Sequence, residues 1–240
     1  MRELLRSPSF RQGFRVGLPL SLAALVLAIS FGVLARPVLG IAATIAISAI
    51  VFAGSAQFGA LAVLAAGGGP AAAIVAGALL NSRYLPMGIA LAPSLRGGPL
   101  RRGLFGQGMV DYSWAAANRG GGKFDPAFML GATTPAYPAW VTGTAIGALA
   151  GDLIGDPGAL GLDAIFPAFF LALLVNGEVS GSKRSIVAAV GGAVVALVLI
   201  PLTPPGVPVI AACLVALIGL ERRQREPRED PTLDKEHGVT

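Results

Sequence analysis

The chain has 240 residues and a formal net charge of +5, and it is 54% hydrophobic and only 13% charged. Soluble domains carry about 25% charged residues, so the composition excludes a large soluble domain and indicates an integral membrane protein. The basic residues flank apolar segments, as the positive-inside rule expects, and therefore do not predict a nucleic-acid partner. One cysteine, Cys213, and one histidine, His237, exclude an intramolecular disulfide and leave no credible metal site, so we expect neither a metal nor a cofactor.

The first predicted element follows a basic N-terminal segment, residues 1–15, which contains four arginines. The apolar run from Val16 to Ala35 has 20 residues, which is enough to cross about 30 Å of hydrocarbon. It is longer than the apolar part of a signal peptide, and further apolar segments follow at once. We therefore expect an uncleaved first span that leaves the N-terminus in the cytoplasm.

The next predicted elements lie in a run of 46 residues, Pro37 to Ser82, that contains no charged side chain. At about 20 residues per span, this run holds two spans, separated by a turn at Gly67 to Pro70. Along the whole chain we predict candidate spans at 16–35, 42–66, 70–92, 104–118, 127–150, 163–177, 185–201 and 206–220. The predicted permease domain is thus 16–220, and residues 221–240 form a charged cytoplasmic tail.

Two membrane topologies fit this pattern of charges. Eight full crossings put both Arg-rich termini inside, but they leave the loop with Arg96, Arg101 and Arg102 outside. If the segments 42–66 and 104–118 are instead re-entrant or broken helices, every basic loop lies inside and six crossings remain. The sequence therefore predicts an all-α bundle of about 6–8 transmembrane helices and does not decide between these two forms.

The predicted segment around Asp111 carries the polar side chains that are hardest to explain in lipid. Gln107, Asp111, Trp114 and Asn118 are spaced by four, three and four residues, so on one helix they would share a face. An amphipathic surface helix would have the same spacing, but Asp111 is the only charge in the stripe. Because a carboxylate at the centre of a membrane helix costs about 2.5–3.5 kcal/mol, we expect Asp111 to bind a proton, a substrate ammonium or a cationic side chain.

Asn81 and Arg83 interrupt the third apolar segment, just before Pro86 weakens its helix. With no functional role, Arg83 would extend its charged end to the membrane interface. Alternatively, Arg83 faces a polar cavity, where it binds a substrate carboxylate through two hydrogen bonds or pairs with Asp111.

Ser55 and Gln57 lie in the sequence GSAQFG of the second apolar segment, where Gln57 is the only amide. The small residues around it allow close backbone approach or a local break in the helix. Gln57 either hydrogen-bonds a neighbouring helix or belongs to an unwound stretch that binds substrate. The candidate substrate or ion pathway therefore consists of Ser55, Gln57, Asn81, Arg83, Gln107, Asp111 and Asn118.

Gly143, Gly147 and Gly151 are spaced by four residues, which predicts a helix-packing face of small residues. The helix that this face contacts is either in the same chain or in another subunit. A second set of small residues with this spacing is Ala188, Gly192 and Ala196. The sequence contains no phosphate-binding loop, nucleophile elbow or metal cluster, so we do not expect an enzyme.

Three stretches combine the polar residues with their apolar surroundings: VFAGSAQFGALAVLAAGG, LLNSRYLPMGIALAPSL and GQGMVDYSWAAA. Together they resemble the AzlC family of branched-chain amino-acid exporters, and the similarity extends over roughly residues 13–220. The resemblance implies secondary export of branched-chain amino acids, often with methionine, and a small hydrophobic partner subunit of the AzlD type. The family commonly has Thr-Asp-Glu where this chain has Val110, Asp111 and Tyr112, so a mechanism with two adjacent carboxylates is not expected here.

The residues and the resemblance together predict a permease of the bacterial cytoplasmic membrane that exports a small apolar amino acid. Such a substrate needs a cation for its carboxylate, an acceptor for its ammonium and apolar walls for its side chain. Arg83 would supply the first, Asp111 with Asn81 the second, and apolar helix faces the third. Two alternatives stay open: a permease for another small metabolite, and a non-transporting assembly subunit whose working surface is the glycine face.

Overall fold

The computed structural model describes residues 6–154, 161, 164, 168, 171, 183–204 and 207–216. Over these residues the regular structure is helical, with one isolated β-bridge between Asn118 and Phe124. The all-α prediction is therefore confirmed for the described part of the chain. Most of the predicted span 163–177 and the whole of the tail 221–240 lie outside the described residues.

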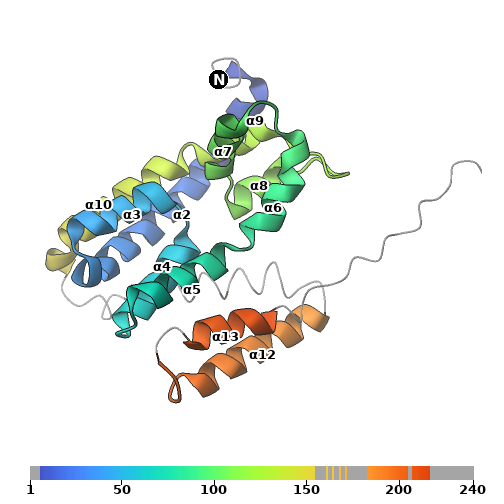
Figure 1. Ribbon diagram of the computed structural model, residues 1–240. Coiled ribbons are helices and arrows are strands. Elements are labelled where there is room, and N and C mark those ends of the chain that lie inside the picture. The colour runs from blue at the N-terminus through green and yellow to red at the C-terminus, as the bar shows by residue number, and fades with distance from the viewer. Residues whose placement is uncertain are drawn as a thin grey trace, which may run out of the picture.

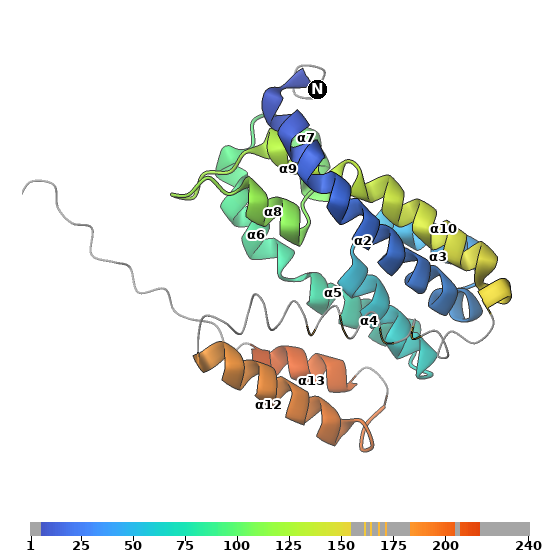
Figure 2. The ribbon, with the colours of Figure 1, turned by 180° about the vertical axis from the view of Figure 1, so that it is seen from behind.

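The long helix α2 (Pro8–Leu39) lies against α9 (Pro126–Thr133) and α10 (Ala136–Ile154) along most of its length (Figures 1 and 2). It begins well before the predicted first span. The side chain of Ser7 caps its first turn by accepting a hydrogen bond from the Phe10 N–H, and a proline occupies the first helical position. Both features start a helix irrespective of how apolar the following residues are.

Glycines allow this close contact between helices. A Cβ on Gly17 would lie 2.1 Å from the carbonyl oxygen of Ala132, and one on Gly147 would lie 2.1 Å from the carbonyl oxygen of Ile29. Along α10 the contacts advance from Gly143 against Leu25 to Gly147 against Ile29, the same direction as along α2, so these two helices run parallel. Backbones that approach this closely are typical of small-residue interfaces between membrane helices.

The predicted span 42–66 is two helices, α3 (Ile41–Val51) and α4 (Gly54–Ala65), with a break between them. Gly40, with φ 78°, turns the chain at the end of α2, and α3 then folds back along α10 (Figure 2). At the break, Phe52 has φ 41° and ψ 47°, a left-handed conformation that is uncommon for residues with a side chain. The segment therefore does not cross as one continuous helix.

The next helix, α5 (Pro70–Asn81), forms a hairpin with α4 after a tight turn at Gly67, where φ is 83°. The chain breaks again at Arg83 and continues as α6 (Tyr84–Leu91) and a short 3-10 helix, η1 (Ala92–Ser94). The two halves are bent by 41° relative to each other. The predicted span 70–92 is thus a bent pair of helices with a basic residue at its bend.

The predicted helix 104–118 is also broken, into α7 (Pro99–Gln107) and α8 (Asp111–Ala117). The prediction of a single polar stripe is therefore wrong, because its four side chains lie on two helices and a loop. The backbone leaves the helical ladder after Gly108, whose carbonyl oxygen is bonded by side chains instead. The spacing of residues along the chain predicts which side chains share a face only within one continuous helix, and not across such a break.

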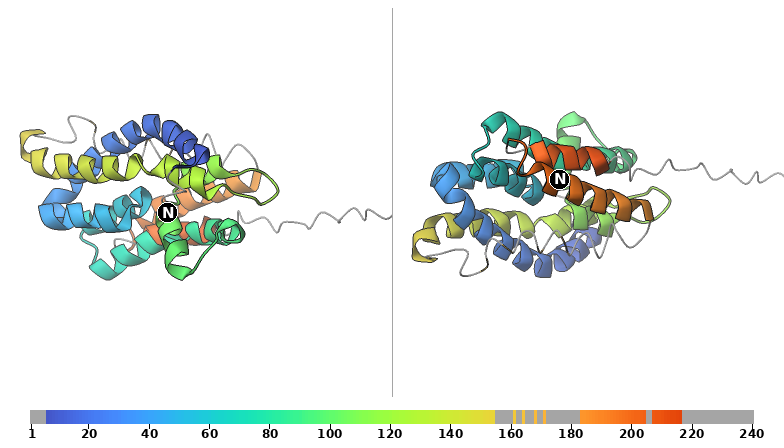
Figure 3. Two further views of the ribbon diagram at one scale, coloured as in Figure 1. Left: turned by 90° about the horizontal axis from the view of Figure 1, so that it is seen from above. Right: turned by 90° about the horizontal axis from the view of Figure 1, so that it is seen from below.

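Two further helices, α12 (Lys183–Leu199) and α13 (Val207–Ala216), form a second hairpin that packs on α5 through α13 (Figure 3). They correspond to the predicted spans 185–201 and 206–220. Within the hairpin, a Cβ on Gly192 would lie 3.4 Å from the carbonyl oxygen of Ala212, so the second small-residue face also packs inside the chain.

Basic loops gather at the end of the molecule where α2 begins. The Ser9 hydroxyl of α2 donates a hydrogen bond to Asp125, and the Phe124 N–H donates to Ser94 Oγ at 3.1 Å. The loop after Ser94 and the loop before Phe124 are both basic. The N-terminal segment and these two loops therefore share one end of the fold, at the top of Figure 1.

Among the described residues, α2 is the one helix that is long and apolar enough to cross a membrane unaided. The bent pair formed by α5 with α6 and η1 is a second candidate, and α3, α4 and α12 are apolar but shorter. In this part of the chain, several of the predicted straight spans are thus broken helices, the form that the sequence left open for 42–66 and 104–118.

Candidate functional site

Three helix breaks meet around one cavity of about 490 Å³. Its lining includes Phe52 and Ala53 between α3 and α4, Arg83 between α5 and α6, and Val110 just before α8. Helices α2 and α10 close the other side with apolar side chains, Trp140 among them. Irregular backbone at membrane depth is tolerated where it is buried in protein or lines a cavity. The three breaks meet this condition because they line the same cavity.

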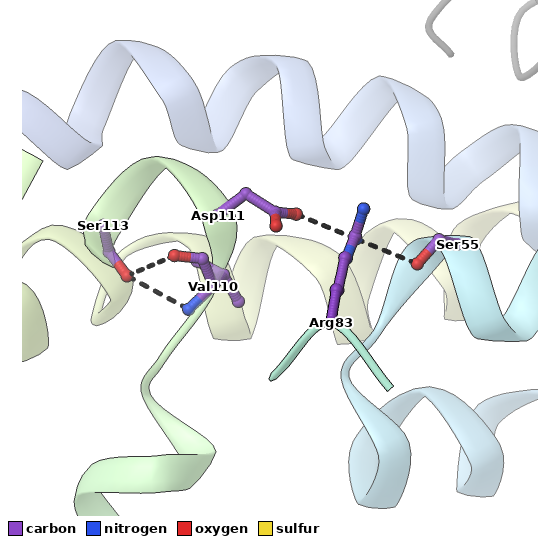
Figure 4. A network of polar contacts seen from close by, with 5 residues as sticks. All are labelled: Ser55, Arg83, Val110, Asp111 and Ser113. Atoms are coloured by element: carbon purple, nitrogen blue, oxygen red, sulfur yellow. Dashed lines mark hydrogen bonds and ion pairs between the residues drawn. The ribbon is translucent and has the colours of Figure 1, made fainter. Parts of the chain in front are cut away.

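Arg83 and Asp111 form an ion pair in the wall of this cavity (Figure 4). Arg83 Nη2 lies 2.9 Å from Asp111 Oδ2, and the same nitrogen donates to Ser55 Oγ at 3.0 Å. The two charged side chains are 37% and 44% exposed, so both are accessible. Pairing compensates two charges that would each be costly alone among apolar helices.

The ion pair leaves polar atoms beside it unused. Arg83 Nε and Asn81 Oδ1 are buried and, within the described residues, have no hydrogen-bond partner. A buried polar atom without a partner costs about 1–3 kcal/mol, so a movement of Arg83 that lets a ligand reach its Nε would recover that energy. Asn81 itself ends α5 and is not among the residues that line the cavity.

Side chains from two other helices bond the carbonyl groups that are freed where α3 ends. The Tyr137 hydroxyl of α10 donates to the Ala49 carbonyl oxygen at 2.7 Å, and Gln107 Nε2 of α7 donates to the Ile50 carbonyl oxygen at 3.2 Å. Free carbonyl groups in lipid are costly, so these bonds stabilise the break. Gln107, predicted as a pathway residue, caps α3 and does not line the cavity.

The break before α8 is held in the same way. The Gly108 carbonyl oxygen accepts from Thr133 Oγ1 at 2.6 Å and from Ser113 Oγ at 3.3 Å, and the Val110 N–H donates to Ser113 Oγ at 3.1 Å. These bonds fix the start of α8 and with it the position of Asp111. Sequence reasoning missed these hydroxyls because Ser and Thr in apolar helices commonly bond their own preceding turn.

Gln57 lies behind the cavity wall in a buried chain of hydrogen bonds. Trp140 Nε1 donates to Gln57 Oε1 at 3.0 Å, Gln57 Nε2 donates to Ser48 Oγ at 2.8 Å, and the Ser48 and Thr144 hydroxyl oxygens are 2.8 Å apart. Gln57 is only 2% exposed and is not among the lining residues. Of the two interpretations open from the sequence, the structure has Gln57 bonded to neighbouring helices, within α4 and not in an unwound stretch.

The remaining predicted residues lie away from the cavity. Asn118 Oδ1 accepts from the Gly120 N–H at 2.8 Å in the loop after α8. Gly143, Gly147 and Gly151 face α2, so this face contacts a helix of the same chain. The predicted pathway residues that do line the cavity are Ser55, Arg83 and Asp111.

A second polar cluster joins the start of α2 to the start of α9. Asp125 accepts hydrogen bonds from the Ser9 hydroxyl, from the Phe128 N–H at 3.0 Å and from Arg119 Nη2 at 3.3 Å. Burial alone would raise the pKa of Asp125, but the bonds from Ser9, Phe128 and Arg119 outweigh it and hold the pKa below its usual value. This cluster ties the basic loop before α9 to α2.

The chain matches proteins from bacteria and an archaeon over nearly its full length. The family model described as AzlC protein matches residues 19–154. The inner membrane protein YgaZ of Escherichia coli K12 is 29% identical over 229 residues, which cover 88% of this chain and 91% of that protein. An uncharacterized membrane protein of Archaeoglobus fulgidus is 34% identical over 219 residues, 89% of this chain and 95% of its own. The branched-chain amino acid transport protein AzlC of Bacillus subtilis 168 is 28% identical over 227 residues, 92% of this chain and 87% of its own. No solved structure matches this chain.

Proposed function

Since the chain belongs to the AzlC family, we propose that it is the transporting subunit of a secondary exporter of branched-chain amino acids in the bacterial cytoplasmic membrane. The observation that carries the proposal is the accessible pair of Arg83 and Asp111 in the wall of an otherwise mostly apolar cavity. An amino acid with an aliphatic side chain combines the same features, two opposite charges and an apolar group. The Bacillus subtilis relative is named as a branched-chain amino acid transport protein, which agrees with this substrate class.

In the proposed complex the substrate opens the ion pair and bonds to both partners. Ion pairs that are partly exposed are worth about 0–1 kcal/mol, and a hydrogen bond to a charged group contributes about 1.5–3 kcal/mol. Replacing one weak pair by two such contacts is therefore favourable. Arg83 Nε, which has no partner among the described residues, offers a further donor for a carboxylate.

The surroundings of Arg83 favour one orientation of the substrate. Figure 4 shows Arg83 between Ser55, at the start of α4, and Asp111, at the start of α8. The N-terminus of α4 carries a partial positive charge and borders the cavity. We therefore place the substrate carboxylate between Arg83 and Ser55 and the ammonium group against Asp111, with the aliphatic side chain toward α2 and α10.

The proposed topology has both termini in the cytoplasm and the segments 42–66 and 104–118 as re-entrant hairpins. The gathering of the basic loops at the end where α2 begins supports this form, because basic loops favour the cytoplasmic side. The breaks at Phe52 and Gly108 support it as well, since each lies where a re-entrant segment would reverse. The cavity then lies between the two membrane surfaces, as in transporters built from discontinuous helices.

Family membership also leads us to propose a small hydrophobic partner subunit of the AzlD type. Co-purification of this chain with the product of a neighbouring short hydrophobic reading frame would test that assembly. The alternative of a non-transporting assembly subunit has less support, because α2 of the same chain covers the glycine face that would serve as its working surface.

The test is leucine efflux from preloaded cells whose own exporters have been deleted. Cells that express this chain with the partner should release labelled leucine, isoleucine and valine faster than cells that carry the empty vector. A variant with Arg83→Gln, present at the same membrane level, should release no more than the vector control. If the unmodified chain releases none of the three amino acids but releases another metabolite, the proposed substrate class is wrong, but the chain is still a permease.

A further inference from the structure

The indole of Trp140 is held at two of its edges, and it forms part of the cavity wall. At one edge its Nε1–H donates to Gln57 Oε1 at 3.0 Å. At the other edge the ring lies over Gly54, where a Cβ would be 2.9 Å from Trp140 Cη2. The ring is thus held by a hydrogen bond on one side. On the other side it packs closely against Gly54, which has no side chain that would displace it.

Gln57 can hold the indole because its own amide is fixed. Its Nε2 donates to Ser48 Oγ, which is bonded in turn to Thr144 Oγ1, each at 2.8 Å. This arrangement needs one group that accepts from an indole and donates to a hydroxyl at the same time, and among uncharged side chains of this length an amide provides both. All three residues behind the wall are at most 2% exposed, so water does not compete for these bonds.

We infer that Gln57 is a positioning residue that orients the Trp140 indole and thereby sets the size of the side chain that the cavity accepts. This inference rests on the proposed function, in which the aliphatic side chain lies toward α2 and α10. The terminal torsion of a tryptophan is broad and weakly restrained by itself. Without the bond to Gln57 the ring turns about this torsion, and the wall no longer has one shape.

The primary test is the ratio of leucine efflux to phenylalanine efflux, measured for Gln57→Met. Methionine has a similar length and removes both hydrogen-bonding groups. A well-shaped apolar pocket separates side chains that differ by one methylene by roughly 10–200-fold, and a loosened wall should lose about tenfold of the discrimination between these two substrates. The matched control is Thr44→Val, which removes a buried hydroxyl of α3 that donates to the Gly40 carbonyl oxygen at 2.7 Å, outside the chain of bonds that holds Gln57. It should lower the folded yield and keep the ratio.

A double-mutant cycle separates an effect through Trp140 from a general loosening of the bundle. Trp140→Phe removes the indole N–H, so Gln57 can no longer orient the ring through a hydrogen bond. Adding Gln57→Met to Trp140→Phe should leave the ratio where Trp140→Phe alone puts it. If instead the two changes lower the ratio of leucine efflux to phenylalanine efflux independently, so that their effects add in the double variant, the inference is overturned.

Fluorescence supplies a readout that does not depend on transport. The chain has two tryptophans, and Trp114 packs against Phe124 outside the cavity, so Trp114→Phe leaves Trp140 as the single emitter. In this background Gln57→Met should shift the emission to shorter wavelength, because the indole N–H loses its acceptor. Thr44→Val should leave the emission where it is.

The outcomes keep the two proposals apart. If the unmodified protein exports neither leucine nor phenylalanine, the proposed function fails, and the emission shift still tests whether Gln57 orients the ring. If it exports leucine selectively and Gln57→Met retains both the ratio and the emission, the inference is wrong. Should Gln57→Met not fold, Gly54→Ala moves the opposite edge of the same ring with Gln57 in place, and an unchanged ratio there would equally overturn the inference.

Discussion

The Arg83 guanidinium lies 2.9 Å from the Asp111 carboxylate although 28 residues separate the two in the chain. Each residue borders a different helix break, and a third break brings Ser55 to the same guanidinium. On continuous helices, these polar side chains would instead lie among the apolar side chains of the neighbouring turns. The breaks therefore bring opposite charges together at the cavity.

The first prediction concerns the two charged residues. Arg83→Gln and Asp111→Asn should each weaken leucine binding by about 10- to 100-fold, because each removes one charge-assisted hydrogen bond to the substrate. Each change also leaves the other charge without its partner, so folded yield should fall as well, but less than leucine binding does, because both side chains are exposed to the cavity. Binding is measured on purified protein, and efflux is measured at matched membrane levels.

The matched control for this prediction is Arg119→Gln. Arg119 also pairs with an aspartate, and its side chain is 45% exposed, but it lies in the loop before α9 and not in the cavity wall. This variant should bind leucine normally. Unimpaired efflux by both Arg83→Gln and Asp111→Asn would rule out the proposed site.

The second prediction concerns the contact between α10 and α2. Gly147→Leu should abolish the folded protein or destabilise it by at least about 3 kcal/mol, because the new side chain meets the Ile29 backbone, which cannot turn aside as a side chain can. Ala145→Leu adds a larger side chain at a partly exposed position of the same helix and should be tolerated. Monodisperse yield after detergent extraction measures both, and equal yields would contradict a role for the glycine face.

The sequence was enough to predict the helical membrane class, the turn near Gly67 and a pairing of Arg83 with Asp111 as one of three alternatives for Arg83. It did not locate the break at Phe52, because nothing local distinguishes a phenylalanine that takes a left-handed conformation from one within a helix. The break is held by Tyr137 and Gln107, which bond carbonyl groups of α3 from other helices. Such long-range capping is visible only once the helices are packed.

The third prediction is a loss of stability in acid that depends on Asp125. Its pKa is lowered in the folded protein, so its contribution is present above the unfolded pKa of about 3.9 and is lost as pH falls through the lower, folded pKa. Asp125→Asn keeps a good helix cap but removes the charge, so its unfolding temperature should depend less on pH below about 4. Parallel curves for the two proteins across that range would show that Asp125 does not titrate in this way.

The last prediction separates the two topologies by cysteine labelling in a Cys213→Ser background, which has no other thiol. Gly98 precedes α7 at the end of the fold where α2 begins, and Gly69 lies in the turn between α4 and α5, toward the lower end of Figure 1. A side chain at either glycine meets nothing within 4 Å, so both cysteine variants should fold. If 42–66 and 104–118 are re-entrant, an impermeant maleimide added to intact cells should label Gly69→Cys and spare Gly98→Cys until the membrane is opened. Labelling of Gly98→Cys from outside would instead support eight full crossings, and it would leave Arg96, Arg101 and Arg102 on the side that basic loops usually avoid.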